Sequence, residues 1–308
     1  PAVVTGFPQV WQDRTAGARI VADDPVLSLE PEAHDLVIHM LSLHWASDPV
    51  GPLVQCRRAL RPDGRFIAAL FGGRSLHEFE GFRLAVFERR GGRAPELGDP
   101  ATLEWIGRFI GRIHAVGALK PYTERPALTI DTFGREPLEF LLKNDWIPPE
   151  LLAAYTSVAE QALAGVAHCY DRAGATPVLR LHGDCHAGNV LWTDAGPHFV
   201  DFDDSRTGPA VQDLWMLLSG ERAEMVRQLS DVLAGYEDFC DFDPRQLYLV
   251  EALRTLRLLH YSAWIARRWD DPAFPAAFPW FNTQRYWQDR ILELREQTAA
   301  MQEAPLIV

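Results

Sequence analysis

The spacing of apolar residues along this chain follows two different patterns. Short apolar runs occur at 35–43 and 65–71, with a helical segment near 50–60 between them. Runs of that length, bounded by polar residues, predict buried strands, so the three segments together predict a βαβ unit. Residues 72–81 predict a break, and the alternation in 83–88 predicts one more strand.

From Asp99 onward the spacing of apolar residues becomes helical. Asp99 can cap a helix that starts at Pro100, and Gly117 can end it. The apolar residues of this helix share one face: Leu103, Ile106, Ile110 and Ile113. Further helices are predicted over 149–170, after Gly208, over 245–269 with Leu249, Leu253, Leu256 and Leu259 turned inward, and at the C-terminal end. The pattern predicts an α+β chain whose larger, C-terminal part is mainly helical.

A dense group of His, Asp and Asn residues follows the second long helix. The sequence reads LHGDCHAGNVLW at 181–192 and, after a loop at 193–197, FVDFDD at 199–204. Two short apolar segments around a loop predict a β-hairpin. In the register that we expect, Trp192 faces His198 and Asn189 faces Asp201.

This register brings together three oxygen-bearing side chains, those of Asp184, Asn189 and Asp201. Oxygen ligands suit a hard cation such as Mg²⁺ that holds phosphate oxygens. A carboxylate that stays off the metal can orient or deprotonate an incoming hydroxyl. Protein kinases use an Asp, an Asn five positions later and a further Asp in this way. The spacing therefore predicts an ATP- and Mg²⁺-dependent phosphotransferase site.

Other polar residues near the motif have more than one interpretation. His182 and His186 are expected to support the loop by hydrogen bonds rather than to bind metal. Asp203 and Asp204 either assist the metal or are solvated surface carboxylates. His114, on a predicted helix, is expected to be a hydrogen-bonded core histidine. Three further residues on a predicted helix could contact a phosphate or an acidic substrate, but exposed charge on the helix surface is the favoured interpretation: Arg254, Arg257 and His260.

The motifs also resemble a known family. HGDCHAGN and FVDFDD resemble the aminoglycoside phosphotransferase and choline kinase superfamily. The longer segments RLHGDCHAGNVLW, FVDFDDSRTGPAVQDLWMLLSG and RRWDDPAFPAAFPWF resemble the bacterial stress response kinase A family of Ser/Thr protein kinases, over about residues 82–305. The resemblance implies a protein-kinase-like C-terminal lobe with a catalytic β-hairpin.

The resemblance also implies roles for individual residues. They are Asp184 and Asp201 in catalysis, Asn189 and Asp201 on Mg²⁺, Phe87 and Glu88 at the adenine hinge for ATP, and Asp213 as the residue that steadies the catalytic loop. In this chain the loop reads H-G-D where protein kinases have H-R-D. Activity is therefore not expected to depend on an arginine that reads an activation-loop phosphate.

The N-terminal part does not have the features of a kinase N-terminal lobe. No lysine precedes Lys120, and Gly6 and Gly17 are isolated, so no glycine-rich phosphate loop is visible. Residues 20–80 instead resemble the middle of a class I S-adenosylmethionine-dependent methyltransferase of the biotin-synthesis or complex-I-assembly type. The resemblance places Asp23 or Asp24 near the adenine and residues 43–45 near the substrate.

This methyltransferase-like segment lacks the first strand and its G-x-G turn, so we expect it to bind no cofactor. In the parent sheet the third and fourth strands are not adjacent, so loss of the first strands predicts an open sheet edge. The expected domains are a partial α/β segment at 1–81, a strand and hinge at 82–98, and a kinase-like lobe at 99–308.

Composition limits the partners. The formal net charge of −12 argues against nucleic acid or an anionic membrane as the main partner. Four widely spaced cysteines without a C-x-x-C pair predict reduced thiols, and no leader or apolar run of ~18 residues is present, so a cytoplasmic location is expected. No oligomeric state is predicted.

Four functions remain open at this stage. The first is a Ser/Thr protein kinase, impaired if its N-terminal lobe is replaced. The second is a small-molecule kinase that phosphorylates an aminoglycoside, choline or a homoserine-like alcohol. The third is an inactive pseudokinase or binding module, and the fourth is a methyltransferase remnant.

Overall fold

The computed structural model describes residues 2–5, 21–22, 31–40, 58–69, 76–79, 82–85 and 91–308. The chain forms two compact units, Pro1–Arg90 and Gly91–Val308. Phe87, Glu88 and the methyltransferase-like positions 23–24 and 43–45 lie outside the described residues, as does most of the helix expected near 50–60.

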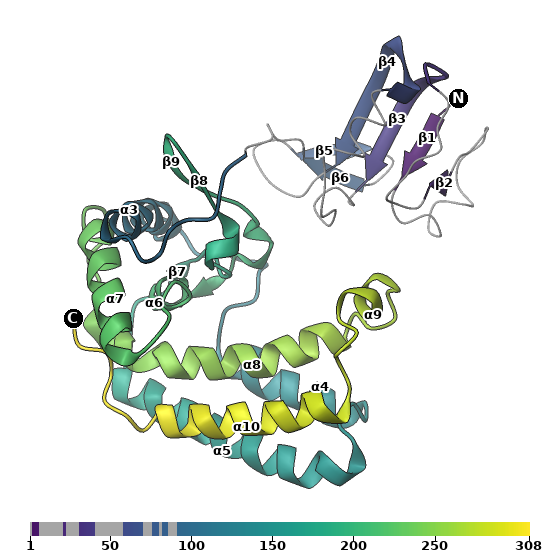
Figure 1. The fold of residues 1–308 in the computed structure, drawn as a ribbon. Coiled ribbons are helices and arrows are strands. Elements are labelled where there is room, and N and C mark those ends of the chain that lie inside the picture. Colours follow the sequence, from purple (N-terminus) through teal and green to yellow (C-terminus); the bar gives the residue numbers. More distant parts are fainter. Residues whose placement is uncertain are drawn as a thin grey trace. The chain divides into compact units, whose positions relative to one another are not determined.

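The first unit contains a parallel sheet with the strand order β2-β1-β3-β4 (Figure 1). Its strands are β1 (Ala2–Thr5), β2 (Val21–Ala22), β3 (His34–Met40) and β4 (Leu60–Ala69). The two strands predicted at 35–43 and 65–71 are therefore confirmed. The expected open edge beside the first of them is wrong, because β1 pairs with β3 along its length.

A separate antiparallel hairpin follows the parallel sheet. It consists of β5 (Leu76–Phe79) and β6 (Phe82–Ala85), paired from Phe79 with Phe82 outward. The predicted strand at 83–88 overlaps β6. The predicted break at 72–81 is wrong, because LHEF alternates apolar and polar residues closely enough to form β5.

In the second unit, helices α3 and α7 form a tightly packed pair. Helix α3 (Pro100–Gly117) begins where predicted, because the Asp99 carboxylate accepts a hydrogen bond from the Thr102 N–H. Helix α7 (Arg222–Tyr236) lies against it. The contact requires glycine at Gly235, where a Cβ atom would lie 1.9 Å from the carbonyl oxygen of Glu104.

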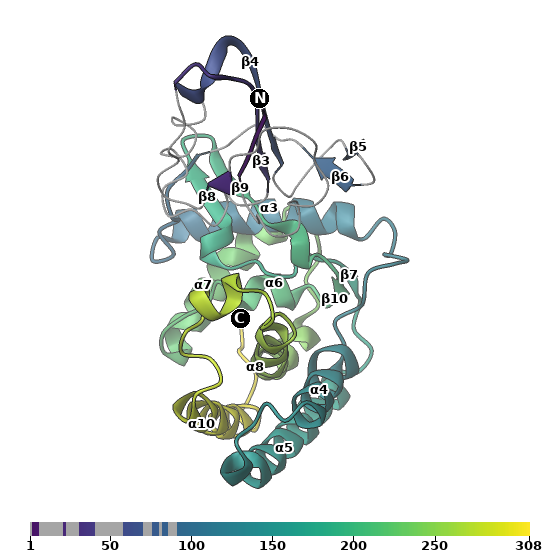
Figure 2. The ribbon, with the colours of Figure 1, turned by 90° about the vertical axis from the view of Figure 1, so that its right-hand side faces the viewer.

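The larger helices form the other side of this unit. They are α4 (Glu136–Lys143), α5 (Pro149–Ala173), α8 (Val250–Ala266) and α10 (Gln284–Ala300). A π-helical turn at Asp131–Arg135 precedes α4, and the 3-10 segment Pro244–Leu249 precedes α8. Figure 2 views α8 along its axis, with α6 above it, α10 below it and α4 beside it. All four leucines predicted to face inward from 245–269 are buried, which confirms that face.

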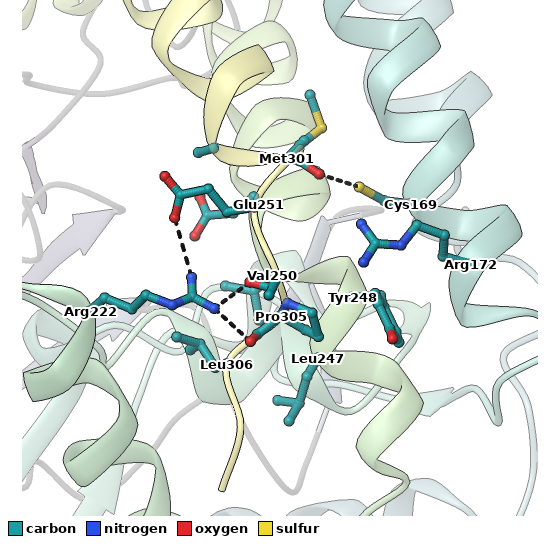
Figure 3. Close-up of a pocket in the computed structure, with 13 residues that line it drawn as sticks. Cys169, Arg172, Arg222, Leu247, Tyr248, Val250, Glu251, Met301, Pro305 and Leu306 are labelled. Carbon is teal, nitrogen blue, oxygen red and sulfur yellow. Dashed lines mark hydrogen bonds and ion pairs between the residues drawn. The ribbon is translucent and has the colours of Figure 1, made fainter.

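The C-terminal segment packs across these helices and is hydrogen-bonded to α7. Arg222 donates hydrogen bonds to the carbonyl oxygens of Ala304 and Pro305, and the Cys169 thiol of α5 contacts the carbonyl oxygen of Met301 (Figure 3). The cavity beneath has a volume of about 20 Å³, which is the space of a single water molecule. It is too small for a substrate.

The rings of the aromatic stretch after α8 pack against one another. It includes α9 (Ala273–Ala277), and Phe274 and Phe281 are buried. Trp269 and Phe281 lie 5.0 Å apart between ring centroids. Among the described residues, no helix is long and apolar enough to cross a membrane.

Small elements lie between the α3–α7 pair and α8 (Figure 1). They are β7 (Leu179–Arg180), which pairs with β10 (Thr207–Gly208), the 3-10 turn Ala187–Asn189, the hairpin of β8 (Val190–Thr193) and β9 (Gly196–Phe199), the 3-10 turn Phe202–Asp204 and helix α6 (Val211–Trp215). The predicted hairpin is thus present.

The expected hairpin register is wrong by one residue. Leu191 pairs with His198, and the carbonyl oxygen of Asn189 accepts a hydrogen bond from the Val200 N–H rather than lying opposite Asp201. The cause is the turn, which has two residues instead of the longer loop that we expected. Thr193 closes it by donating to the carbonyl oxygen of Gly196, whose φ is 101°.

Candidate active site

The loop that begins the motif is anchored by a buried carboxylate. Asp213 on α6 is fully buried and accepts hydrogen bonds from the backbone N–H groups of His182, at 2.7 Å, and Gly183, at 2.9 Å. His114 on α3 adds a third bond, with its Nε2 2.9 Å from Oδ2. A buried carboxylate is stable only when such donors replace water. Asp213 therefore fixes the backbone at the start of the loop.

His114 is a hydrogen-bonded core histidine, as predicted. Its Nδ1 lies 3.0 Å from the Tyr236 hydroxyl, so one neutral tautomer donates to Asp213 and accepts from Tyr236. Both ring nitrogens are used inside the fold. Through this residue, α3 and α7 support the same carboxylate that holds the loop.

Glycine is required at the second position of the H-G-D motif. Gly183 has a φ of 92°, and a Cβ atom there would lie 2.1 Å from the carbonyl oxygen of Asp204. A side chain would meet both a disfavoured backbone conformation and a backbone clash. The packing of the loop against residue 204 thus explains why no arginine stands at this position.

The two motif histidines make hydrogen bonds to the backbone. His182 Nε2 donates to the carbonyl oxygen of Val200 at 2.8 Å, and its Nδ1 accepts from the Asp184 N–H at 3.3 Å. His186 Nδ1 accepts from the Gly188 N–H at 3.0 Å. His182 therefore connects the loop to the end of β9, while His186 shapes the turn that carries Asn189.

Asp184 lies at the centre of the loop with its carboxylate 19% exposed. Its Oδ1 forms an ion pair of 2.7 Å with Arg257 of α8, and its Oδ2 is 3.5 Å from His186 Nε2. Burial acts to raise the pKa of Asp184, but the His186 hydrogen bond and the charge of Arg257 outweigh it and lower this pKa to about 2. The carboxylate is therefore ionised at neutral pH.

Asn189 is bound directly to Asp184. Its Nδ2 donates to the Asp184 carbonyl oxygen at 2.9 Å and lies 3.4 Å from the Asp184 Oδ2. The amide nitrogen is thereby committed, and the amide oxygen is the atom that remains for another ligand. The D-x-x-x-x-N spacing thus joins these two side chains in space.

Asp201 follows β9, one residue beyond the Val200 pair. It is exposed and has a φ of 63° and a ψ of 64°. Left-handed backbone is uncommon for residues other than glycine and is enriched at functional sites. The structure therefore places this carboxylate at a sharp change of chain direction beside the backbone partner of Asn189.

The donor set fits Mg²⁺ that is shared with a nucleotide. In the part of the chain that the structure describes, no group of three or more His, Cys, Asp or Glu residues could hold a metal by itself. Asn189 and Asp201 could offer two oxygen ligands of the hard type. Mg²⁺ typically takes one or two protein carboxylates and completes its shell with phosphate oxygens and water.

The two following aspartates are in different surroundings. Asp204 is paired with Arg206, whose guanidinium is mostly buried. Asp203 is exposed, and its carbonyl oxygen accepts a hydrogen bond from Arg125 at 2.6 Å. The Asp204 carboxylate is thus paired with Arg206. For Asp203, both interpretations remain: a carboxylate that assists the metal, or a solvated surface carboxylate.

Arg257 is the residue whose place in the site differs most from the sequence-based interpretation. Helix-surface charge was favoured for it, yet its guanidinium contacts the catalytic-loop carboxylate. A signal was present in the sequence, because Arg257 lies one turn from Leu253 and beside Leu256 in an otherwise inward-facing run. Gln212, which donates to the carbonyl oxygen of Gly183, had no such signal.

Comparisons with known proteins decide the family. Residues 32–250 match the phosphotransferase enzyme family, APH. The chain is 41% identical over 264 residues to the serine/threonine protein kinase RdoA of Salmonella typhimurium, and 42% identical over 264 residues to stress response kinase A of Escherichia coli K12. Each match covers 85% of this chain and 80% of the relative. The chain belongs to the stress response kinase A family.

A solved structure shares the fold of this stress response kinase A family member. It is the amicoumacin kinase hAmiN in complex with AMP-PNP, Ca²⁺ and Ami, with a TM-score of 0.50 and 15% identity, covering 71% of this chain and 64% of that one. The predicted kinase-like fold with a mainly helical C-terminal lobe is confirmed at this level.

The same comparisons give the methyltransferase resemblance no support. The family match begins at residue 32, inside the segment assigned to a methyltransferase fragment. The matches to curated relatives take in 85% of the 308 residues and therefore also extend into 1–81. A methyltransferase remnant is therefore without support.

Proposed function

We propose that this chain is an ATP- and Mg²⁺-dependent phosphotransferase that acts on Ser/Thr hydroxyls of a protein. The observation that carries the proposal is the setting of Asp184, an ionised carboxylate on a loop fixed by Asp213 and bound to Asn189. The relative RdoA, which is named as a serine/threonine protein kinase, supports the choice of acceptor.

In the proposed reaction, Asp184 receives a hydrogen bond from the acceptor hydroxyl and takes its proton as the bond to phosphorus forms. The bond between the γ-phosphorus and the oxygen of the leaving ADP breaks in the same transfer. Asn189 and Asp201 would hold Mg²⁺, which neutralises charge on the phosphates when bound. Asp213 and His182 keep the loop fixed, so that little reorganisation accompanies the transfer.

A second candidate, a pseudokinase, is favoured by one observation. No lysine occurs among the first 119 residues, whereas protein kinases use a lysine of the N-terminal lobe to hold ATP phosphates. This candidate predicts no phosphate transfer to any acceptor. The proposed function predicts transfer despite weak ATP binding.

The test is a phosphate-transfer assay with labelled ATP and Mg²⁺, in which protein and peptide acceptors are compared with aminoglycosides and choline. We expect Ser/Thr acceptors to be labelled, and Asp184→Asn to lower kcat by about 10²–10⁴-fold, the usual contribution of a general base. Asp194→Asn, in the exposed hairpin turn, is the matched control and should retain the wild-type rate.

Two outcomes would contradict the proposal. Labelling of amino alcohols but not of peptides would assign a small-molecule kinase. A wild-type protein without turnover, with Asp184→Asn indistinguishable from it, would assign a pseudokinase.

A further inference from the structure

Helix α8 and the turn that follows it carry arginines that begin at the Asp184 carboxylate. Arg257 contacts Asp184, and Trp264 and Arg268 follow on the same face at helical spacing, with Arg267 beside the latter. Hydrogen bonds from the Arg267 and Arg268 N–H groups to Ala263 and Ile265 continue the last turn. We call Arg257, Arg267 and Arg268 the arginine track.

Aromatic rings hold the guanidinium groups at the far end of the track. Arg267 lies over Phe140 at 4.9 Å, and Arg268 lies over Trp264 at 4.6 Å from the ring centroid. A guanidinium over a ring face keeps N–H groups for a carboxylate or phosphate. In Arg268 one of these groups, at Nη1, donates to the carbonyl oxygen of Trp264 at 3.2 Å, and the others remain. Both arginines are exposed, so the remaining N–H groups are open to solvent.

Among the described residues, no carboxylate forms an ion pair with Arg267 or Arg268. The acidic residues next to them in sequence are Asp270 and Asp271, and Asp271 accepts a hydrogen bond from the Ala273 N–H. Arg268 does interact with Asp204 through space, but Asp204 forms its close ion pair with Arg206. The charge of Arg267 and Arg268 is available to an external anion.

The two carboxylate oxygens of Asp184 have different neighbours. Asn189 and His186 approach Oδ2, whereas Arg257 approaches Oδ1 from α8. The proposed metal ligand is therefore on one side of the base and the arginine track on the other. This arrangement assigns the track to the acceptor rather than to the nucleotide.

We propose that the arginine track binds an anionic side chain, a carboxylate or a phosphate, of the protein acceptor. The inference rests on the proposed protein kinase function. Ten residues of α-helix separate Arg257 from Arg267, a distance of about 15 Å. An extended peptide covers that distance in four or five residues, so the preferred anion lies about four or five positions from the acceptor hydroxyl.

The track also bears on small acceptors. Choline and aminoglycosides are cationic, and Arg257 already occupies one oxygen of the carboxylate that a cationic acceptor would approach. Like charges at an interface disfavour the wrong partner. The track therefore selects acidic acceptors and disfavours cationic ones.

The experiment uses serine peptides that are identical except at the positions four and five residues from the serine, on either side. Those positions carry aspartate, phosphoserine, alanine or lysine, and the full-length chain phosphorylates each peptide with Mg²⁺-ATP. We expect kcat/KM to be about tenfold higher for the aspartate and phosphoserine peptides than for alanine, as two exposed ion pairs allow. Lysine peptides should be worse than alanine.

Substitutions test the residues themselves. The double variant Arg267→Gln/Arg268→Gln should lose the preference, and Arg267→Glu/Arg268→Glu should reverse it toward lysine peptides. Arg285→Gln on α10, which is also exposed, is the matched control and should keep it. Each protein is compared with itself on the four peptides, so a reduced fraction of folded protein cancels in the ratio.

The outcomes separate the inference from the function on which it rests. A preference for both anions identifies charge as the recognised property, and a preference for phosphoserine alone identifies phosphate. Equal rates on all peptides overturn the inference and leave the kinase function standing. An absence of turnover on every peptide overturns both.

Discussion

At the scale of single residues, Asp184 is held between the Arg257 guanidinium and the His186 ring. Arg257 contacts one carboxylate oxygen, and the His186 ring lies near the other. A base must be ionised before the hydroxyl arrives, and this environment ensures that it is. In the proposed reaction the same environment would make Asp184 a weak base, so transfer would depend on its position more than on its proton affinity.

His260 provides a prediction about acid stability. Its ring stacks on Phe133 at 4.1 Å, and burial, together with Arg206, Arg267, Arg257 and Arg268, lowers its pKa to about 3. In the unfolded chain this histidine takes up a proton near pH 6.5. Between these two pH values the unfolded state binds more protons, so the folded state loses stability as pH falls from 6.5 toward 3.

We therefore expect His260→Phe, which keeps an aromatic ring against Phe133, to weaken this loss. The measurement is the free energy of unfolding in urea at several pH values between 7 and 4. The difference between wild type and variant should change steadily over that range. Parallel curves would show that His260 does not contribute.

At the scale of elements, the α3–α7 pair and α6 act together on the catalytic loop. His114 from α3 and Tyr236 from α7 end a chain of buried hydrogen bonds that begins at the loop amides and passes through Asp213. The two helices approach closely because Gly235 has no side chain. Helix packing thus sets the position of the loop.

A matched pair of substitutions tests this chain. His114→Phe removes the bond to Asp213, and Tyr236→Phe removes only the bond beyond it. Each leaves a buried polar group without a partner, so each should lower the free energy of unfolding by about 1–3 kcal/mol. Only His114→Phe should also lower kcat, as measured in the phosphate-transfer assay. Equal kcat values for the two variants would contradict the role of His114.

The elements show which features a sequence can predict. The start of α3 was predicted because Asp99 and Pro100 act locally, and the inward leucines of α8 were predicted because their periodicity is regular. The hairpin was predicted, but its register was not, because one turn residue more or less shifts every pair. The contact of Arg257 with Asp184 joins distant segments, and no local pattern encodes it.

At the scale of the whole molecule, the residues of the proposed active site belong to one of two compact units. Asp184, Asn189, Asp201 and Asp213 all lie in Gly91–Val308. Motif spacing predicted the kinase-like lobe correctly, because its chemistry needs particular residues at fixed intervals. The first unit has no such motif, and a short parallel βαβ pattern is common to many folds, so its resemblance to a methyltransferase was not specific, and the comparisons do not support it.

Nucleotide binding by the full chain can be measured without turnover. A ligand that binds only the folded state stabilises it, by about 2.7 kcal/mol at a concentration 100 times Kd. We expect ATP and Mg²⁺ together to raise the thermal midpoint more than either alone, and Asp201→Asn to abolish the effect of Mg²⁺. The same midpoint with and without Mg²⁺-ATP would argue against a nucleotide site.

The close approach of Gly183 to Asp204 has a mechanical consequence. Backbone atoms of the base-bearing loop touch the segment that follows Asp201, and Ser205 adds a bond of 2.6 Å to the carbonyl oxygen of Leu181. No flexible side chain separates the loop around Gly183 from the segment around Asp204, so we expect displacement of one segment to displace the other. We therefore expect Asp184 and Asp201, the proposed base and the proposed metal ligand, to be displaced together, so that a signal acting on either would affect both.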